Sequence, residues 1–451
     1  MQAGVARFLR LSANAAALLA LFACTVLSGA QTYAVIHQFN QTDGAWPIGN
    51  LIADSAGNLY GVTEYGGTKG FCAEGCGTVF QLKKYSGTWQ FNEIYQFTGG
   101  SDGFGPLAGL TMDSAGNLYG TAYQGGANSQ GVVYELSPGA GGSWTQSVLW
   151  AFQGAASNDG AFPASQMVFD SSGNLYGTTE LDGTGTCGAF NTCGTVFMLS
   201  PNSSGGWTES ILYNFNNPND TYGPNGWEPT GPVVFDGHGN LFGTTRVGGS
   251  LNSFCGISLY GCGVVFELSP SLGGWTESVA YTFNGDPGGG YPAGGVTLDS
   301  AGNLYGTASA GGDGCASYYN PCAGTVFVLR PGTSGGYIGH TVFTFEGGYA
   351  EPEPGGGLPL GSLTLDSAGI IYGSAASGGR ALNGKSGNGT IYKLSRSSGV
   401  LQQTVLHVFE PVGAGGSGPS SNLLIDSAGN LYGTTAGGGS SGNGVVFAIK
   451  P

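Results

Sequence analysis

One nine-residue segment recurs seven times along the chain, and this repetition constrains the fold more than any other feature. The segment is clearest as Asp299-Ser-Ala-Gly-Asn-Leu-Tyr-Gly-Thr307. A fixed period near sixty residues is typical of a repeat architecture, in which each copy forms one supersecondary unit. The copies begin at Asp54, Asp113, Asp170, Asp236, Asp299, Asp366 and Asp426.

Each repeat predicts four short strands. In the fifth copy, residues 296–298 and 304–308 are apolar and flank a tight turn, which Asp299 caps and Gly302 closes. A Gly-rich loop then leads to a third strand at 324–329. The fourth strand is clearest one repeat earlier, at 275–283, where large and small side chains alternate. Four antiparallel strands in each of seven repeats predict an all-β fold, a seven-bladed β-propeller.

The two ends of the chain predict how the ring closes. The last repeat stops after its third strand, at residues 444–449, and the missing fourth strand matches residues 33–39 near the other end. We therefore expect the N-terminal strand to complete the final blade. Closure of this kind protects the end repeats from edge-to-edge pairing.

The first thirty residues predict a secretory signal peptide. Arg7 and Arg10 precede an apolar run, and Ser28-Gly-Ala30 forms a small-residue cleavage site. An alternative is a lipoprotein signal acylated at Cys24. No other apolar stretch approaches the roughly 20 residues that span a bilayer. We expect residues 31–451 to form one exported propeller domain, monomeric and secreted, with periplasmic or lipid-anchored placement as the alternative.

Charge excludes one class of partner. Loss of Arg7 and Arg10 with the signal changes the net charge from −15 to −17. A chain this acidic is repelled by phosphate backbones, so we expect no nucleic-acid binding.

Eight cysteines fall into close pairs, each ahead of a Gly-(Thr/Val)-Val-Phe strand or its equivalent. An even count at equivalent positions in an exported chain predicts local disulfides rather than metal sites, because the four histidines do not recur beside the pairs. The predicted pairs are Cys72 with Cys76, Cys187 with Cys193, Cys255 with Cys262, and Cys315 with Cys322.

The repeat unit resembles a known family. The run D-S-A-G-N-L-Y-G-T-T, followed by G-G, G-T-V-F-x-L and W-T-x-x-x-L-Y-x-F, is similar to the Gloeo-Verruco (GloVer) tandem repeat of exported bacterial proteins. The resemblance covers nearly all of residues 32–451 and implies no catalytic residues, because the family has no established molecular function. Family members carry varied C-terminal anchors, whereas no sorting helix follows Lys450, so the chain looks like a freely secreted form.

Candidate site residues lie in loops on the face opposite the Asp-Ser-Ala-Gly turns. That face varies between repeats, so we expect specificity there. Entry loops carry an acid ahead of a proline, and a ring of such acids could bind Ca²⁺; the alternative is that Asp-Gly and Pro only form turns. The candidate metal ligands are Asp43, Asp102, Asp159, Asp220 and Asp286. No other cofactor is expected.

A second set of candidates follows the second strand of each repeat. Repeat-equivalent positions project to one rim, where they hold Glu64, Tyr123, Glu180, Arg246, Ser309, Ala376 and Ala436. The first four could form a polar ligand site, or a general acid and base. Trp46 and Trp227 could stack on sugar rings, or they could pack between blades.

These patterns favour a secreted, non-catalytic binding module for a polysaccharide or a cell-surface partner. One alternative is a polysaccharide-active hydrolase or lyase that uses carboxylates on the loop face; another is a structural surface or matrix protein. No G-x-S-x-G, H-E-x-x-H or phosphate-loop motif is present. An enzyme is therefore the less favoured interpretation.

Overall fold

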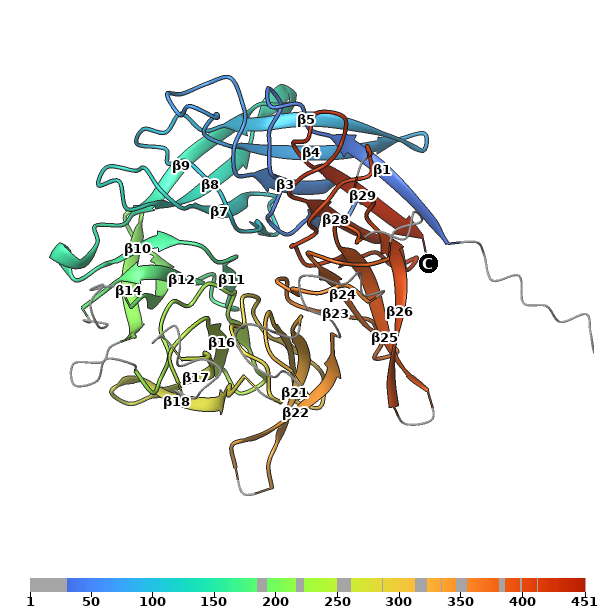
Figure 1. Cartoon of the computed structure of the whole chain (residues 1–451). Coiled ribbons are helices and arrows are strands. Elements are labelled where there is room, and N and C mark those ends of the chain that lie inside the picture. The colour runs from blue at the N-terminus through green and yellow to red at the C-terminus, as the bar shows by residue number, and fades with distance from the viewer. Residues whose placement is uncertain are drawn as a thin grey trace, which may run out of the picture.

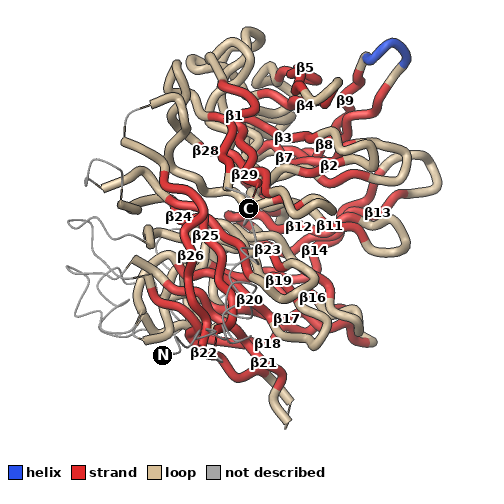
Figure 2. The backbone as a smooth tube through the Cα atoms, turned by 90° about the vertical axis from the view of Figure 1, so that its right-hand side faces the viewer, coloured by secondary structure: helices blue, strands red, loops and turns tan. Residues whose placement is uncertain are grey.

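A computed structural model describes residues 31–184, 193–215, 223–249, 261–285, 287–312, 323–333, 335–345, 355–380, 386–397, 400–411 and 413–450. Seven small antiparallel sheets stand around a common axis and form a seven-bladed β-propeller, as predicted (Figure 1). Viewed from the side, the strands of neighbouring blades lie roughly alongside one another, with loops at both faces (Figure 2). Within the part of the chain just given, no helix is long and apolar enough to cross a membrane.

Each blade runs from a two-residue inner strand to a long outer strand. Blade 1 is β2 (Ile52–Ala53), β3 (Leu59–Thr63), β4 (Thr78–Tyr85) and β5 (Thr88–Gln96). Blade 2 is β6 (Thr111–Met112), β7 (Leu118–Ala122), β8 (Val132–Pro138) and β9 (Trp144–Ala151). Blade 3 is β11 (Val168–Phe169), β12 (Leu175–Asp182), β13 (Thr195–Pro201) and β14 (Trp207–Asn214), with β10 (Gly160–Pro163) added beside β12. Two short 3-10 turns, η1 (Ala140–Gly142) and η2 (Ala155–Ser157), lie in connections of blades 2 and 3.

The remaining blades follow the same order. Blade 4 is β15 (Val234–Phe235), β16 (Leu241–Thr245), β17 (Val264–Ser271), β18 (Gly274–Thr282), and blade 5 is β19 (Thr297–Leu298), β20 (Leu304–Ala308), β21 (Thr325–Pro331), β22 (Tyr337–Thr344). Blade 6 is β23 (Thr364–Leu365), β24 (Ile371–Ala375), β25 (Thr390–Ser397), β26 (Val400–Val408), and blade 7 is β27 (Leu424–Ile425), β28 (Leu431–Thr435), β29 (Val445–Lys450), completed by β1 (Thr32–Gln38).

The N-terminal strand closes the ring, which confirms the prediction from the chain ends. β1 pairs antiparallel with β29, from Thr32 opposite Lys450 to Gln38 opposite Val445. Tyr33 on this strand stacks on His407 of blade 6, with ring centroids 3.7 Å apart. His37 stacks on Phe91 of blade 1 at 4.0 Å. The closing strand is therefore held by both neighbouring blades.

The repeated aspartate organises the turn between the first two strands. In blade 1, Asp54 Oδ1 accepts the backbone N–H groups of Ala56 and Asn58, each at 2.9 Å. Its Oδ2 accepts Asn58 Nδ2 at 2.7 Å and the Tyr60 hydroxyl at 3.0 Å. Partial burial acts to raise the pKa of Asp54, but these hydrogen bonds outweigh it and the pKa is lowered. Each carboxylate oxygen of Asp54 therefore accepts two hydrogen bonds within the turn and the strand that follows it.

Neighbouring blades pack through a shared apolar core and a set of hydroxyl contacts. A Cβ on Gly61 would lie 2.5 Å from Phe80 Cζ, so the aromatic ring of the third strand requires glycine in the second. In six blades, a Thr or Ser of the second strand donates to a backbone carbonyl at the inner edge of the next blade. The donors are Thr121, Thr178, Thr244, Thr307, Ser374 and Thr434.

Candidate functional site

The residue before the proline that recurs in each entry loop adopts a left-handed backbone conformation. Its φ lies between 54° and 66° in all seven blades. Only two of these residues are glycine, although this conformation is unfavourable for residues with a side chain. We call these seven residues the pre-proline ring: Trp46, Gly105, Phe162, Glu228, Tyr291, Leu358 and Gly418.

Backbone hydrogen bonds to the preceding blade hold this conformation. Glu228 donates its N–H to the carbonyl of Cys193 at 3.1 Å, and Tyr291 donates to Cys262 at 2.8 Å. Trp46 donates to Asn443 at 2.9 Å and so also joins the last blade to the first. These bonds make the position rigid, and its side chain is presented in a fixed direction.

The rim residues predicted from the sequence lie directly beside the pre-proline ring. The backbone N–H of Glu64 donates to the carbonyl of Trp46 at 3.0 Å, and Arg246 donates to Glu228 at 3.0 Å. Strand pairing of β10 with β12 places Phe162 opposite Glu180 in the same way. The loop face therefore carries two adjacent sets of side chains, one from the entry loops and one from the residues after the second strands.

The two sets are chemically uneven around the ring. All the aromatic and charged side chains of the two sets lie on blades 1 to 5, whereas blades 6 and 7 carry only small or aliphatic ones, as do one position each of blades 2 and 5. We call the first group the half-ring: Trp46, Glu64, Tyr123, Phe162, Glu180, Glu228, Arg246 and Tyr291. The remaining positions are Gly105, Ser309, Leu358, Ala376, Gly418 and Ala436.

Two of the predicted rim residues contact each other across a blade boundary. The Tyr123 hydroxyl of blade 2 donates to Glu180 Oε2 of blade 3 at 2.8 Å. Phe162 packs against the Tyr123 ring with centroids 5.1 Å apart. Burial, followed by the charge of Glu180, raises the pKa of Tyr123, so the phenol stays protonated and acts as a donor.

A third carboxylate at this place, Glu228, was not predicted from the sequence. Its Oε2 accepts a hydrogen bond from Arg246 Nε at 3.0 Å. On blade 4, an ion pair therefore joins the pre-proline residue to the rim residue. Burial raises the pKa of Glu228; the Arg246 charge opposes this and the Glu180 charge adds to it. The position directly before Pro229 was the available signal, because its equivalents include the predicted Trp46.

Glu64 and Trp46 lie at the other end of the half-ring. The Trp46 side chain is 48% exposed and meets Tyr65 edge-on at 5.6 Å. Burial raises the pKa of Glu64, Tyr65 lowers it by hydrogen bonding, and the Glu74 charge raises it again. Glu64 and Glu180 belong to blades 1 and 3, with the Tyr123 blade between them.

Trp227 occupies a different environment from Trp46. Its side chain is 5% exposed and belongs to a core cluster with Val233 and Phe266. It precedes the pre-proline residue by one position, so its side chain turns toward the core. This burial favours the packing interpretation for Trp227.

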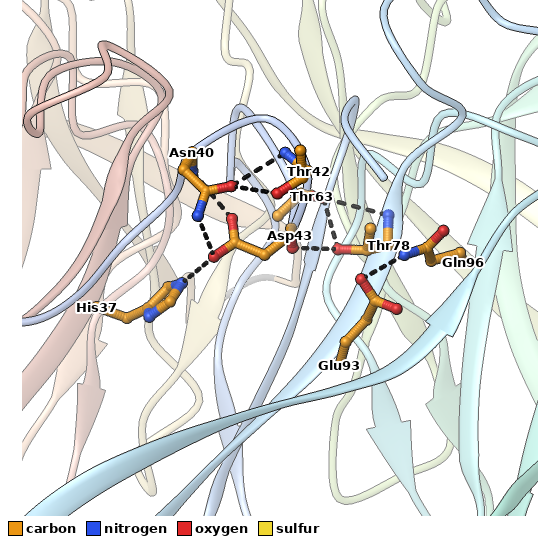
Figure 3. Close-up of polar contacts among 8 residues, drawn as sticks. All are labelled: His37, Asn40, Thr42, Asp43, Thr63, Thr78, Glu93 and Gln96. Carbon is orange, nitrogen blue, oxygen red and sulfur yellow. Dashed lines mark hydrogen bonds and ion pairs between the residues drawn. The ribbon is translucent and has the colours of Figure 1, made fainter. Parts of the chain in front are cut away.

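Each described entry-loop aspartate binds its own loop. Asp43 accepts the Asn40 N–H at 2.9 Å and approaches His37 Nε2 at 3.2 Å (Figure 3). Asp102 accepts the Thr98 N–H of its own loop at 2.8 Å and the Tyr95 hydroxyl of β5 at 3.0 Å. Asp159 accepts the Gln153 N–H at 2.9 Å. Burial raises the pKa of Asp159 despite these bonds.

No three His, Cys, Asp or Glu side chains of the described ranges are grouped closely enough to hold a metal ion. Asp220 and Asp286 lie outside those ranges. Ca²⁺ binding by the entry-loop aspartates stays a prediction.

One predicted disulfide is described in full. Cys72 and Cys76 are joined, and the Cys76 carbonyl accepts the N–H of Gly105 at 3.0 Å. Cys193 and Cys262 are also disulfide-bonded, while Cys187, Cys255, Cys315 and Cys322 lie outside the described residues. Cys76, Cys193 and Cys262 thus supply the carbonyl that holds the next blade's pre-proline residue, whereas Ala323 supplies it for Leu358.

A narrow cavity of about 130 Å³ occupies the middle of the ring. It is lined by the residues that follow each recurring proline, so the pre-proline ring surrounds its mouth. Asn50 Nδ2 donates to Gln166 Oε1 at 2.9 Å and joins blades 1 and 3, which are not neighbours. The lining is uncharged, and the cavity is too small for a ligand of drug size.

A family model described as the Gloeobacter/Verrucomicrobia repeat matches residues 20–190, 73–257 and 253–451. The chain belongs to this repeat family. The matches confirm the resemblance seen in the repeat unit. No curated protein matches this chain in sequence.

Two solved structures match most of the chain at low sequence identity. A protein from Lactobacillus plantarum is 14% identical, with 81% of this chain and 85% of that chain covered and a TM-score of 0.47. A candidate 6-phosphogluconolactonase from Bacteroides uniformis is 13% identical, with 80% and 85% covered and a TM-score of 0.46. Likeness at this level carries no argument about function for this Gloeobacter/Verrucomicrobia repeat protein.

Proposed function

We propose that this repeat protein is an exported binding module that captures a polysaccharide through the half-ring. The observation that carries the proposal is the pre-proline ring. Blades 2 and 7 use glycine at this left-handed position, whereas the other five blades hold a side chain there at an energetic disadvantage of roughly 1–2 kcal/mol each. In blade 6 that side chain is the aliphatic Leu358, and in the other four it is aromatic or charged, as Trp46, Phe162, Glu228 and Tyr291. Such strain is expected where the side chain serves binding.

The chemistry of the half-ring suits a polyhydroxylated ligand. Carboxylates of Glu64, Glu180 and Glu228 accept hydrogen bonds from hydroxyl groups, and the Tyr123 hydroxyl can accept as well. The exposed Trp46 ring offers an apolar surface for the C–H face of a sugar. Acidic side chains outnumber the single Arg246 here, so neutral glycans are favoured over polyanions.

A glycan-binding screen of residues 31–451 tests the proposal, with immobilised neutral polysaccharides and with Ca²⁺ or chelator present. We expect saturable binding that falls at least tenfold in Glu180→Gln, because loss of a charged acceptor removes about 1.5–3 kcal/mol. The matched control is Ala376→Ser, a rim change on blade 6 that should leave binding unaltered. Absence of binding to every glycan, or equal loss in both variants, would contradict the proposal.

A hydrolase is the second candidate, and one observation favours it. Glu180 and Glu228 are close enough that the charge of Glu180 raises the pKa of Glu228, as is common for a general acid beside an ionised carboxylate. Catalysis predicts new reducing ends from a bound polysaccharide, lost in Glu228→Gln. Binding without product formation would leave the non-catalytic module as the function.

A further inference from the structure

One repeat lacks a hydroxyl that the other six carry at the Asp-Ser-Ala-Gly turn. In those six, the second-strand tyrosine donates to the turn aspartate, as Tyr119 does to Asp113 Oδ2 at 3.1 Å. Blade 4 has Phe242 at this position. Among the described residues, Asp236 Oδ2 therefore has Asn240 Nδ2, at 2.9 Å, as its one side-chain donor.

A second carboxylate stands beside the place of the missing hydroxyl. Glu267 is paired with Phe242 across β16 and β17. Burial raises the pKa of Glu267; the Ser269 hydroxyl lowers it and the Asp236 charge raises it, so the two carboxylates interact. Blade 2 contains the same pair, Asp113 and Glu135, but there the Tyr119 hydroxyl is present.

Asp236 and Glu267 line a cleft of about 670 Å³ between blades 4 and 5. Its walls include His238, Tyr337 and the backbone of Gly332, Gly335 and Gly336. His238 is exposed and replaces the Ala or Ser of the other six turns. Phe242 is buried and packs against the wall residue Tyr337, with ring centroids 5.4 Å apart. Two residues unique among the repeats thus meet at one cleft of ligand size.

We propose that this cleft binds a ligand in which a hydroxyl group is carried on a ring. The ligand hydroxyl donates to the Asp236 and Glu267 pair, as tyrosine does within the other turns, and its ring lies against Tyr337 and His238. The paired carboxylates disfavour anionic ligands. Because antiparallel strands place the turns and the entry loops at opposite ends, the cleft lies on the face opposite the half-ring.

Sugars and phenols both present such a group, and the probes separate them. The signals of the His238 ring are followed by NMR while methyl glycosides of glucose, galactose and mannose, p-cresol, or methylammonium are added to residues 31–451. His37, His340 and His407 are internal references. We expect a saturating shift of His238 alone with a glycoside or with p-cresol, which identifies the source of the ring.

The decisive variant is Phe242→Tyr, which restores the hydroxyl of the other repeats. It should fold with a thermal transition at least as high as that of the wild type and bind the same probe at least tenfold more weakly, since the cleft then supplies its own donor. Glu267→Gln should weaken binding in the same direction. The matched control, Tyr176→Phe, removes the equivalent hydroxyl where the paired residue is Met198. It should leave probe binding at His238 unaltered, although loss of its bond to Asp170 should lower stability.

No His238 shift with any ring ligand, a response to methylammonium only, or equal affinity in Phe242→Tyr would overturn the proposal. It is independent of the half-ring, because Glu180→Gln should leave the His238 titration unaltered.

Discussion

Single residues in this propeller depart from the repeat in ways that reveal either strain or function. In five blades, the third-strand residue that pairs with the second-strand glycine is phenylalanine. In blades 2 and 6 it is Tyr134 and Tyr392. Both hydroxyl groups are buried and have no hydrogen-bond partner within the described ranges. A buried, unsatisfied hydroxyl costs roughly 1–3 kcal/mol.

We therefore expect Tyr134→Phe to raise the free energy of unfolding by about 1 kcal/mol or more, measured by denaturant titration. Tyr60→Phe serves as the control, because that hydroxyl is bonded to Asp54 at 3.0 Å and its loss should destabilise. A drop in stability for Tyr134→Phe would show that its hydroxyl has a partner.

The residue scale also shows where sequence reasoning succeeds and where it fails. The turn aspartates were predicted to be structural because Asp, Gly and Asn at fixed spacing specify a turn locally, and Asp54 shows this role. The left-handed conformation of Glu228 could not be predicted, because a residue before proline favours extended backbone. Its conformation is imposed by the Cys193 carbonyl of another blade, which local sequence does not encode.

At the scale of elements, neighbouring blades are joined by the hydroxyl contact from the second strand to the next inner edge. Thr307 Oγ1 donates to the Gly361 carbonyl at 2.9 Å. Blade 1 has Val62 at the equivalent position, so the hydroxyl is missing between blades 1 and 2. The equivalent acceptor would be the carbonyl of Ala108.

Val62→Thr should add this bond and raise the free energy of unfolding by about 0.5–1.5 kcal/mol. Thr307→Val makes the opposite change and should lower it by about 1–3 kcal/mol, because a buried carbonyl loses its donor. Equal effects of the two substitutions, in the same direction, would show that volume rather than hydrogen bonding governs this contact.

Strand positions were predictable because large and small side chains alternate over 275–283, and the structure places β18 at Gly274–Thr282. The additional strand β10 was not predictable. It forms because the entry loop of blade 3 follows β12 to Asp182, which depends on the tertiary placement of that loop.

At the scale of the whole molecule, ring closure depends on a neutral histidine. Burial, opposed by the Glu410 charge, lowers the pKa of His407 to about 4, and its ring stacks on Tyr33 of the closing strand. The unfolded chain binds a proton at this histidine below about pH 6.5, whereas the folded chain does so only near pH 4. Stability from His407 is therefore complete above pH 6.5 and is lost as the pH falls toward 4.

His407→Tyr should reduce this acid sensitivity, because Tyr95, Tyr213 and Tyr281 occupy equivalent positions. In thermal unfolding across pH 4 to 7, the Tm of the variant should fall less than that of the wild type as the pH is lowered. Parallel curves for the two proteins would mean that His407 does not titrate between the folded and unfolded states. The closure itself was predictable, since a missing last strand and a matching first strand leave one arrangement without free edges.

Binding at the half-ring is tested most directly by measuring glycan affinity and unfolding free energy together on Trp46→Gly. Relief of the left-handed conformation, roughly 1–2 kcal/mol, should offset loss of the half-exposed indole, so stability should change by less than about 1 kcal/mol. Affinity for the captured polysaccharide should fall at least tenfold, while Leu358→Gly, the same change on blade 6, should leave affinity unaltered. A loss of about 3 kcal/mol or more in stability with unchanged affinity would instead show that Trp46 is retained for packing.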